Sequence, residues 1–263
     1  TEMTNRAPTV TVLMSIYNGA QYLTEAVESI LDQQFTDFEF LIVNDASTDT
    51  SRQILTQFEQ RDQRIRIIDN PENRGLTRSL NNGINAAQGE FIARIDADDL
   101  ALPGRLAKQV DHLRRSTTCT IVGSVAKLID SDGQSTGQTE HFSPAQLTAQ
   151  LLFFNSITHS SVMFRRDRII ALGGYNEEFV RAQDYDLWMR CLTDGQQIEL
   201  LPDVLTAHRV HSGQVTTTQT ATMEQCRRLA VQNAWRDILG AELSNEFLTQ
   251  QHQLLTNQPV SKL

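Results

Sequence analysis

Three carboxylates stand within four residues at the end of a hydrophobic stretch, and they are the strongest candidates for chemistry in the chain. Asp96, Asp98 and Asp99 follow residues 91–95, which read as a buried strand. Like charges this close raise each other's pKa unless a cation joins them. Magnesium and manganese ions prefer carboxylate oxygens and often share them with a substrate phosphate. The run therefore predicts a divalent-metal site, and the alternative interpretation is a solvated acidic turn or a helix cap.

Two more aspartates stand where chemistry is plausible. Asp45 directly follows the apolar residues 38–43, and its carboxylate can accept a hydrogen bond from a base or a ribose. Asp184 stands at or just before the start of a helix predicted over residues 185–192, where an ionised carboxylate can act as a general base. An Asx turn or a cap explains Asp45 equally well, and helix N-capping is favoured for Asp184 when that residue is taken alone.

Histidines and arginines supply further candidates. A neutral imidazole is a good ligand for Mn²⁺ as well as Zn²⁺, which brings in His208 and His211, with His159 a weaker candidate. Arg74 and Arg78 flank a predicted helix start, and either can neutralise a phosphate. For all of these residues a structural or solvated role is the alternative interpretation.

The elements that must position these residues alternate between strands and helices. Short apolar and β-branched runs predict strands over residues 10–15, 38–43, 65–68 and 91–95. Helical spacing between them predicts three helices, one with Leu23, Val27 and Ile30 on a single face and one that Ser47 caps. This βαβαβαβ order predicts a parallel sheet with helices on both faces. Ligands in such sheets bind beyond the carboxyl ends of the strands, which selects residues 15–18, 44–47 and 96–99.

The second half of the chain has a more mixed pattern. Helices are expected over residues 103–114 and 185–192, and strands over residues 121–129 and 160–164. Residues 221–255 are rich in Gln, Ala and Leu, which predicts two helices that break near Gly240.

Composition limits the classes of function. The 263 residues carry 23 Lys and Arg against 32 Asp and Glu, a net charge of −9, so no nucleic-acid partner is expected. No apolar run approaches the roughly 18 residues that a membrane-spanning helix needs, and residues 1–10 contain no secretory apolar segment. A cytoplasmic protein is therefore expected. Cys119, Cys191 and Cys226 match no metal framework by their spacing and read as reduced thiols.

Taken together, these motifs resemble the family 2 glycosyltransferases, whose catalytic domain has the GT-A fold. The resemblance covers residues 8–215 in the family's order, through the segments 9–18, 45–49, 73–76, 87–92, 96–99 and 183–190. It implies an α/β GT-A domain over residues 1–215, with a mostly parallel sheet flanked by helices. The nucleotide-binding half would span about 8–100 and the acceptor half about 101–215, followed by a C-terminal helical extension over 216–263.

The resemblance also implies a reaction, a cofactor and the residues that serve them. A sugar would move from a nucleotide-diphosphate donor, expected to be a UDP-sugar, to an acceptor hydroxyl with inversion, assisted by Mn²⁺ or Mg²⁺. The donor-binding residues carried over from the family are Ser15, Tyr17, Asp45, Arg78 (with Arg74 as its alternative), Asp96 and Asp98. Asp98 and His211 would hold the metal, and Asp184 would take the acceptor's proton. Many members have Pro in place of Ser15 and Glu in place of Gln183, whereas Asp184 is retained.

The expected partners follow from the same resemblance. They are a nucleotide-sugar donor and a glycan, lipid-linked or small-molecule acceptor, in bacterial polysaccharide or glycan synthesis. The enzyme would lie in the cytoplasm or peripherally at the inner face of the cell membrane, and its C-terminal helices could form a homodimer.

Two other classes of function stay open. One is a non-catalytic sugar-nucleotide or glycan-binding relic of the same fold, against which the presence of Asp96, Asp98 and Asp184 argues. The other is a metal-dependent phosphotransfer enzyme of the haloacid-dehalogenase type. That class needs its nucleophilic aspartates at the end of the first strand, where this chain has Ser15 and Tyr17. Donor hydrolysis with Mn²⁺ and a phosphatase assay separate these alternatives.

Overall fold

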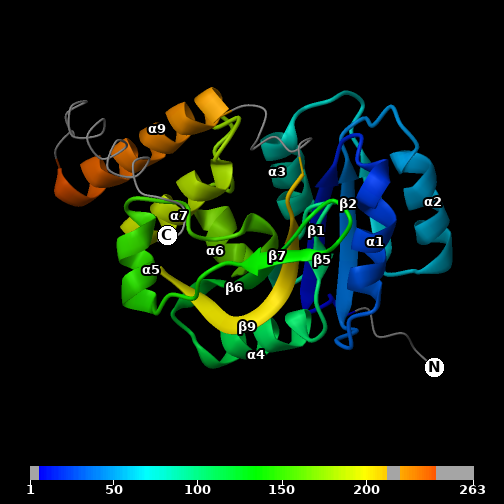
Figure 1. The fold of residues 1–263 in the computed structure, drawn as a ribbon, viewed down its shortest axis with the longest axis horizontal. Coiled ribbons are helices and arrows are strands. Elements are labelled where there is room, and N and C mark those ends of the chain that lie inside the picture. The colour runs from blue at the N-terminus through cyan, green and yellow to red at the C-terminus, as the bar shows by residue number, and fades with distance from the viewer. Residues whose placement is uncertain (1–5, 212–219, 241–263) are drawn as a thin grey trace.

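The computed structural model describes residues 6–211 and 220–240, and in these residues a nine-stranded mixed sheet forms the centre of the molecule (Figure 1). Its strand order is β3-β2-β1-β4-β8-β6-β9-β5, with β7 paired to β6 off this path. The strands are β1 (Val10–Ile16), β2 (Phe38–Asn44), β3 (Ile65–Asp69), β4 (Phe91–Arg94), β5 (Leu100–Ala101), β6 (Cys119–Ile129), β7 (Ser135–Gln138), β8 (Met163–Arg165) and β9 (Gln197–Arg209).

Helices flank the sheet and connect its strands. They are α1 (Ala20–Leu31), α2 (Ser51–Arg61), α3 (Leu76–Ala86), α4 (Arg105–Arg115), α5 (Pro144–Leu151), α6 (Arg166–Ala171), α7 (Gln183–Thr193) and α9 (Thr220–Leu239), with a short 3₁₀ turn, η1 (His159–Ser161). Figure 1 shows α1 and α2 on one side of the parallel strands, while α5, α6, α7 and α9 gather around the second half of the chain.

The parallel half of the sheet confirms the expected βαβαβαβ order. β1 pairs in parallel with both β2 and β4, and β2 pairs in parallel with β3. The sequence-based strand starts are right, and the ends differ by one residue. Because these strands all run in one direction, their carboxyl ends meet at one edge of the sheet, where Tyr17, Asp45 and Asp96 follow them.

The apolar runs are explained by burial on both faces of the sheet. Along β1, Val12 and Met14 pack in a core with α1, α2 and α4, whereas Leu13 between them packs in a second core with α3 and α7. A strand with two buried faces carries no alternating polar side, which is why residues 10–16 read as a nearly continuous apolar stretch.

The second half of the sheet contains strands that the sequence pattern did not predict, namely β5, β7 and the long strand β9. β8 is antiparallel to both β4 and β6, and β6 is parallel to the long strand β9, which curves strongly in Figure 1. Pro202 interrupts the strand pattern of β9, and the β6–β9 register shifts around Ser124 and Val125. The expected strand over residues 160–164 is instead η1 followed by β8.

Two local expectations need comment. Ser47 does not cap α2, because Thr50 is the N-cap; Ser47 Oγ instead accepts a hydrogen bond from the backbone N–H of Asn18 at 3.1 Å. The expected helix break near Gly240 agrees with the end of α9 at Leu239, while the second expected helix lies outside the described residues. Ala230, Val231 and Ala234 of α9 belong to the same core as α7. None of the described helices combines the length and the hydropathy needed to cross a bilayer.

Candidate active site

Asp96 is held by a buried arginine from its own strand end. The side chain of Arg94 is fully buried, and its Nη2 pairs with Asp96 Oδ1. Ser160 Oγ donates to Asp96 Oδ2 at 2.8 Å and accepts the backbone N–H of Asp96 at 3.0 Å. Burial raises the pKa of Asp96, but the charge of Arg94 and these hydrogen bonds outweigh it and lower the pKa to about 2. Asp96 is therefore an ionised, oriented carboxylate.

Asp99 has a different environment from Asp96. Its side chain is fully buried, and its carboxylate accepts the backbone N–H of Arg209 at 2.8 Å. His208 Nδ1 lies 3.0 Å from the other carboxylate oxygen. Burial alone lowers the pKa of His208, but the hydrogen bond and charge of Asp99 raise it to about 9. His208 is therefore a charged partner of Asp99.

Asp98 is the carboxylate of the cluster that faces the second predicted metal ligand. His211 Nε2 lies 3.2 Å from Asp98 Oδ2. Arg209 links the two segments, since its Nε donates to the backbone carbonyl of Asp98 at 3.0 Å. The ring of Tyr22 packs against two side chains of the second segment: its centroid lies 4.3 Å from the Arg209 guanidinium carbon and 5.3 Å from the centroid of the His211 ring. A carboxylate oxygen and an imidazole nitrogen that converge in this way fit a manganese or magnesium ion.

Asp45 is buried and organises the loop before α3. Its Oδ1 accepts hydrogen bonds from Asn70 Nδ2 at 2.7 Å and from the backbone N–H of Arg74 at 2.9 Å. Its Oδ2 accepts the backbone N–H of Gly75 at 2.8 Å. Gly75 has a φ of +84°, a conformation that glycine adopts without strain. Asp45 thus fixes the backbone at the start of α3, beside the edge where the base was expected.

The other predicted donor residues differ in their exposure. Ser15 is buried near the end of β1, whereas the Tyr17 side chain just beyond it is 51% exposed. Arg78 lies on the exposed side of α3, and its Nε donates to Glu177 Oε2 at 3.1 Å. Arg74 is exposed in the loop that Asp45 holds. An exposed Tyr17 ring is available for stacking, while the Arg78 side chain is paired at the surface.

Asp184 occupies the first turn of α7, as the sequence pattern predicts. Asn155 Nδ2 donates to Asp184 Oδ2 at 2.8 Å, and the backbone N–H of Tyr185 donates to Asp184 Oδ1 at the same distance. Ala182 precedes the helix in the left-handed conformation, with a φ of +52°. The helix N-terminus favours an ionised carboxylate at this position, and Asn155 fixes the orientation of one oxygen.

His159 lies in η1 and packs between Tyr175 and Trp188. Its Nε2 lies 2.8 Å from the Tyr175 hydroxyl, and its ring lies edge-on to Trp188 of α7 with centroids 6.1 Å apart. Burial and the nearby charge of Arg94 lower the pKa of His159 to about 4, although Asp184 and Asp96 both act to raise it. The neutral imidazole therefore packs against Trp188 of α7, and Ser160 next to it contacts Asp96 directly.

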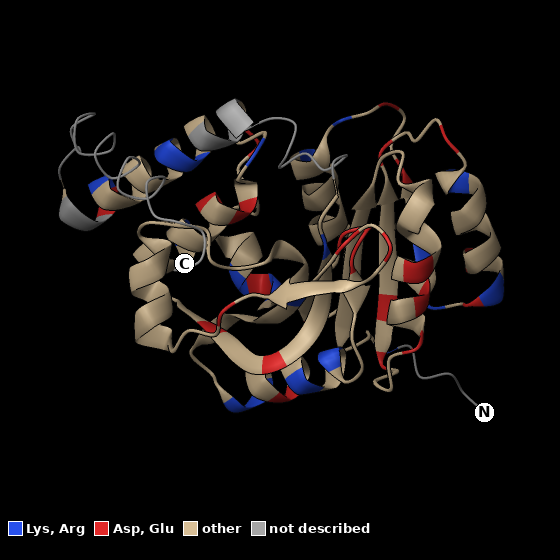
Figure 2. Ribbon diagram, viewed as in Figure 1, with Lys and Arg blue, Asp and Glu red and all other residues tan. Residues whose placement is uncertain are grey.

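Sequence reasoning missed Arg94 and undervalued His159. An arginine inside the apolar strand 91–95 is out of pattern, and that signal was available to find Arg94. His159 carries no comparable signal, because a lone histidine is more often structural. Figure 2 shows acidic loop segments in front of the strands of the parallel half in this view. Arg94 and Arg209 are buried.

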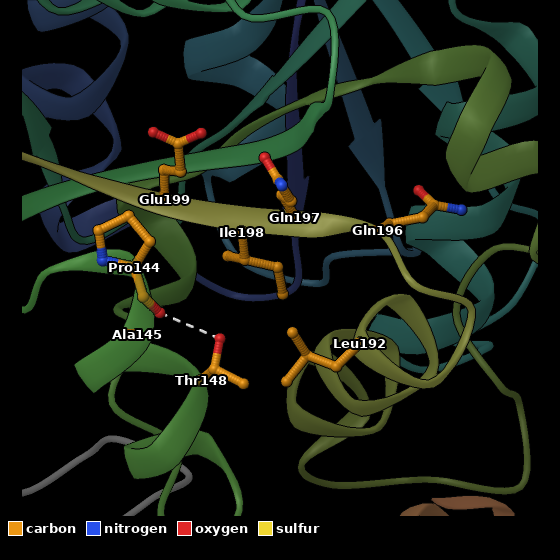
Figure 3. A pocket seen from close by; sticks show the side chains of 8 residues that line it. All are labelled: Pro144, Ala145, Thr148, Leu192, Gln196, Gln197, Ile198 and Glu199. Atoms are coloured by element: carbon orange, nitrogen blue, oxygen red, sulfur yellow. Dashed lines mark hydrogen bonds between the residues drawn. The ribbon is translucent and has the colours of Figure 1, made fainter.

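One described cavity lies away from these residues. Its volume is about 410 Å³, and it lies between α5, the end of α7 and the start of β9 (Figure 3), lined by Pro144, Ala145, Thr148, Leu192, Gln196, Gln197, Ile198 and Glu199. None of the sequence-predicted site residues lines it, so this cavity does not define the candidate active site.

Known proteins similar to this chain are glycosyltransferases. The family model described as glycosyl transferase family 2 matches residues 11–172. An uncharacterized glycosyltransferase of Methanocaldococcus jannaschii, MJ1057, is 32% identical over 209 residues, which cover 77% of this chain and 71% of that protein. The O-antigen biosynthesis glycosyltransferase WbnJ of Escherichia coli is 29% identical over 206 residues, covering 77% of this chain and 80% of that protein.

Solved structures confirm the expected GT-A architecture. The S. aureus TarS fragment 1–349 in complex with UDP-GlcNAc matches with a TM-score of 0.71 and 20% identity, over 92% of this chain and 70% of that one. The mannosyltransferase PcManGT from Pyrobaculum calidifontis, in complex with GDP-Man and Mn²⁺, matches with a TM-score of 0.67 and 20% identity, over 94% of this chain and 69% of that one. At 20% identity, this likeness shows a shared fold alone.

Proposed function

Because this chain belongs to glycosyl transferase family 2 and is a glycosyltransferase, we propose that it moves a sugar from a UDP-sugar to an acceptor hydroxyl, with inversion at the anomeric carbon. The observation that carries the proposal is the arrangement around His159. Ser160 of η1 contacts Asp96, and His159 of the same turn packs against Trp188 of α7, the helix whose first turn contains Asp184. The UDP-GlcNAc in TarS supports the choice of donor class.

The described residues fit a divalent cofactor at Asp98 and His211. Their ligand atoms converge to 3.2 Å from two distant segments, and both atom types suit Mn²⁺. A bound ion would neutralise the charge that develops on the departing diphosphate. The Mn²⁺ in PcManGT supports the choice of ion. Asp96 is paired with Arg94, Asp99 with His208, and Asp98 with His211.

Asp184 is proposed as the general base. An acceptor hydroxyl is a poor nucleophile at neutral pH, and a positioned carboxylate that takes its proton usually accelerates such a step by about 10²–10⁴. Asn155 holds one carboxylate oxygen by a hydrogen bond, and the backbone N–H of Tyr185 in α7 holds the other. Attack from the side opposite the leaving group would invert the anomeric centre.

Donor recognition is proposed for the edge formed by β1, β2 and β4. The exposed Tyr17 ring can stack on the base. Asp45 would act mainly through the loop 73–75, whose backbone it holds, although its carboxylate is also proposed to contact the base. Arg78, or Arg74 from that loop, would neutralise phosphate charge. Ser15 would line the ribose side of the same edge.

The acceptor is proposed to be a glycan or a lipid-linked sugar of bacterial polysaccharide synthesis, which the O-antigen role printed for WbnJ supports. Residues 101–215 would form the acceptor half. Cytoplasmic action, peripheral contact with the inner membrane face, and dimerisation through residues 216–263 are proposals too. The apolar side of α9 that includes Ala230 and Ala234 packs on its own chain, so a dimer would use another face.

The test compares Asp184→Asn with Asp194→Asn, a matched change at the opposite end of α7. UDP-sugars and GDP-sugars are supplied with Mn²⁺ and an acceptor panel, and nucleotide release and product anomer are measured by NMR. We expect Asp184→Asn to bind donor normally and to transfer about 10²–10⁴ times more slowly, while Asp194→Asn keeps the wild-type rate. A product with retained configuration, or full turnover by Asp184→Asn, would remove the base role. Turnover with GDP-sugars alone would replace the proposed donor.

A further inference from the structure

A second group of ligand-type side chains lies where α4 meets the starts of β6 and β9. His112 is in the last turn of α4, Cys119 is the first residue of β6, and Glu199 is the third residue of β9. One ligand atom from each of them, the imidazole nitrogen, the thiol sulfur and a carboxylate oxygen, lies within 4.8 Å of the other two. His112 Nε2 and Glu199 Oε2 lie 3.2 Å apart.

This cluster is remote from the candidate active site. Glu199 precedes His208 by nine residues on the same strand, which corresponds to about 30 Å of extended chain. Figure 3 shows the Glu199 side chain on the opposite face of β9 from Ile198, which points toward α5 and α7. Glu199 thus projects toward His112 of α4, and the cluster is built from residues that the proposed transfer reaction does not use.

One polar atom of the cluster is poorly satisfied without a ligand. His112 Nε2 is shielded from solvent and makes no hydrogen bond within the described residues, although the carboxylate of Glu199 lies beside it. A buried polar atom without a partner is costly. Cys119 is fully buried, with its Sγ 3.2 Å from the carbonyl oxygen of Ile121. Arg165 donates to the backbone carbonyl of Cys119 and not to its sulfur.

We propose that His112, Cys119 and Glu199 bind one Zn²⁺ ion, with water as the fourth ligand. Thiolate, imidazole and carboxylate are the three ligand types that zinc takes in proteins, at about 2.0–2.3 Å. Tetrahedral bonds of that length set the ligand atoms roughly 3.3–3.8 Å apart, and the three atoms already lie within 4.8 Å of one another, so small side-chain shifts would close the site. The ion replaces the thiol proton, which leaves to solvent. It joins the end of α4 to two strands, a structural role separate from the ion proposed at Asp98 and His211.

Cobalt substitution tests the site directly, because a thiolate bound to Co²⁺ gives a near-ultraviolet charge-transfer absorption that oxygen and nitrogen ligands do not. The full chain is treated with a chelator and then titrated with Co²⁺ or Zn²⁺. We expect the absorption at one ion per chain, and a rise in Tm of about 5 °C at Zn²⁺ a hundredfold above its Kd. Cys119→Ser loses the absorption, whereas Cys191→Ser, a matched change at another buried cysteine, keeps it.

Two further variants protect the test against misfolding and against the other metal site. His112→Gln and Glu199→Gln change side chains that are about a quarter exposed, and each should weaken Zn²⁺ binding at least tenfold while the apo chain unfolds normally. Asp98→Asn should leave the thiolate absorption unchanged. The proposal is overturned if the wild-type chain shows no thiolate absorption, or if the His112 and Glu199 variants bind Zn²⁺ with the affinity of the wild type.

Discussion

His211 Nε2 lies 3.2 Å from Asp98 Oδ2, although 113 residues separate the two in the chain. Asp98 follows β4, and His211 follows the end of β9. The two segments are brought together because β5, just after Asp98, pairs antiparallel with the end of β9. The Arg209 side chain then donates to the carbonyl of Asp98 and to Glu25 Oε2, which fixes the approach. The pair therefore depends on the second half of the sheet as much as on the acidic run itself.

Replacing either member of this pair should remove metal-dependent donor binding. Asp98→Asn and His211→Gln each keep the size of the side chain but weaken a metal ligand. We expect Mn²⁺-dependent UDP binding, measured by calorimetry, to weaken and transfer to fall by about 10² or more. The control is His141→Gln, an exposed histidine whose Nε2 contacts the carbonyl oxygen of Leu200. Undiminished nucleotide binding with Mn²⁺ in both site variants would contradict the metal assignment.

Asn155 should matter for turnover and not for donor binding. Its amide donates to Asp184 Oδ2 at 2.8 Å, and the residue belongs to the segment between α5 and η1 and not to the loops that follow β1, β2 and β4. Asn155→Ala removes one hydrogen bond to a charged group, worth about 1.5–3 kcal/mol at most when fully formed, so we expect kcat to fall about tenfold with the donor KM unchanged. Initial rates at varied donor concentration measure both. A variant in which only the donor KM rises would place Asn155 at the donor instead.

The parallel half of the fold was predictable because its signal is local. β1 and β2 are buried on both faces, so each is a continuous apolar run, and turn residues mark where each ends. β9 was not predicted because Pro202 interrupts its pattern, and its pairing with β6 and β5 makes it a strand. The Ser47 cap failed for a similar reason, since that hydroxyl is used by the distant backbone of Asn18.

The site was predictable as a set of residue types and not as a set of pairings. The sequence indicated that three aspartates need a cation, but not that Arg94 compensates Asp96 while His208 compensates Asp99. Those partners come from the strand interior and from a segment more than a hundred residues away. The roles proposed for Ser15, Tyr17, Asp45 and Arg78 stay predictions. The His112, Cys119 and Glu199 cluster shows no sequence motif at all, because three separate elements supply it.

His159 should make the protein less stable in mild acid. Its folded-state pKa is lowered to about 4 from 6.5, because of burial and the charge of Arg94. The unfolded chain therefore binds more protons between these two pH values, and the free energy of unfolding should fall as pH drops from 6.5 toward 4. Denaturant unfolding in a chelating buffer at several pH values measures this slope. His159→Gln should flatten the slope in that window, and an unchanged slope would show that this imidazole is not buried as a neutral group.

His208 should produce the opposite dependence on the alkaline side. The buried carboxylate of Asp99 and the nearby charges of Asp96 and Asp98 outweigh the burial of His208 and raise its pKa to about 9 from 6.5. A folded-state pKa above the unfolded value gives stability that is fully present below pH 6.5 and is lost as pH rises through about 9.

The two histidines therefore act in separate pH windows, which makes each slope assignable by substitution. His208→Gln should lower stability at pH 6 and remove most of the decline between pH 6.5 and 9, whereas His141→Gln should leave that decline intact. The thiols of Cys119 and Cys191 add a decline of their own as pH approaches and passes about 9, because burial raises the folded pKa of each to about 12, and this contribution is the same in the His208 and His141 variants. If His208→Gln loses stability equally at pH 6 and pH 9, the imidazole acts as a neutral hydrogen-bond donor to Asp99, and the ion pair does not form.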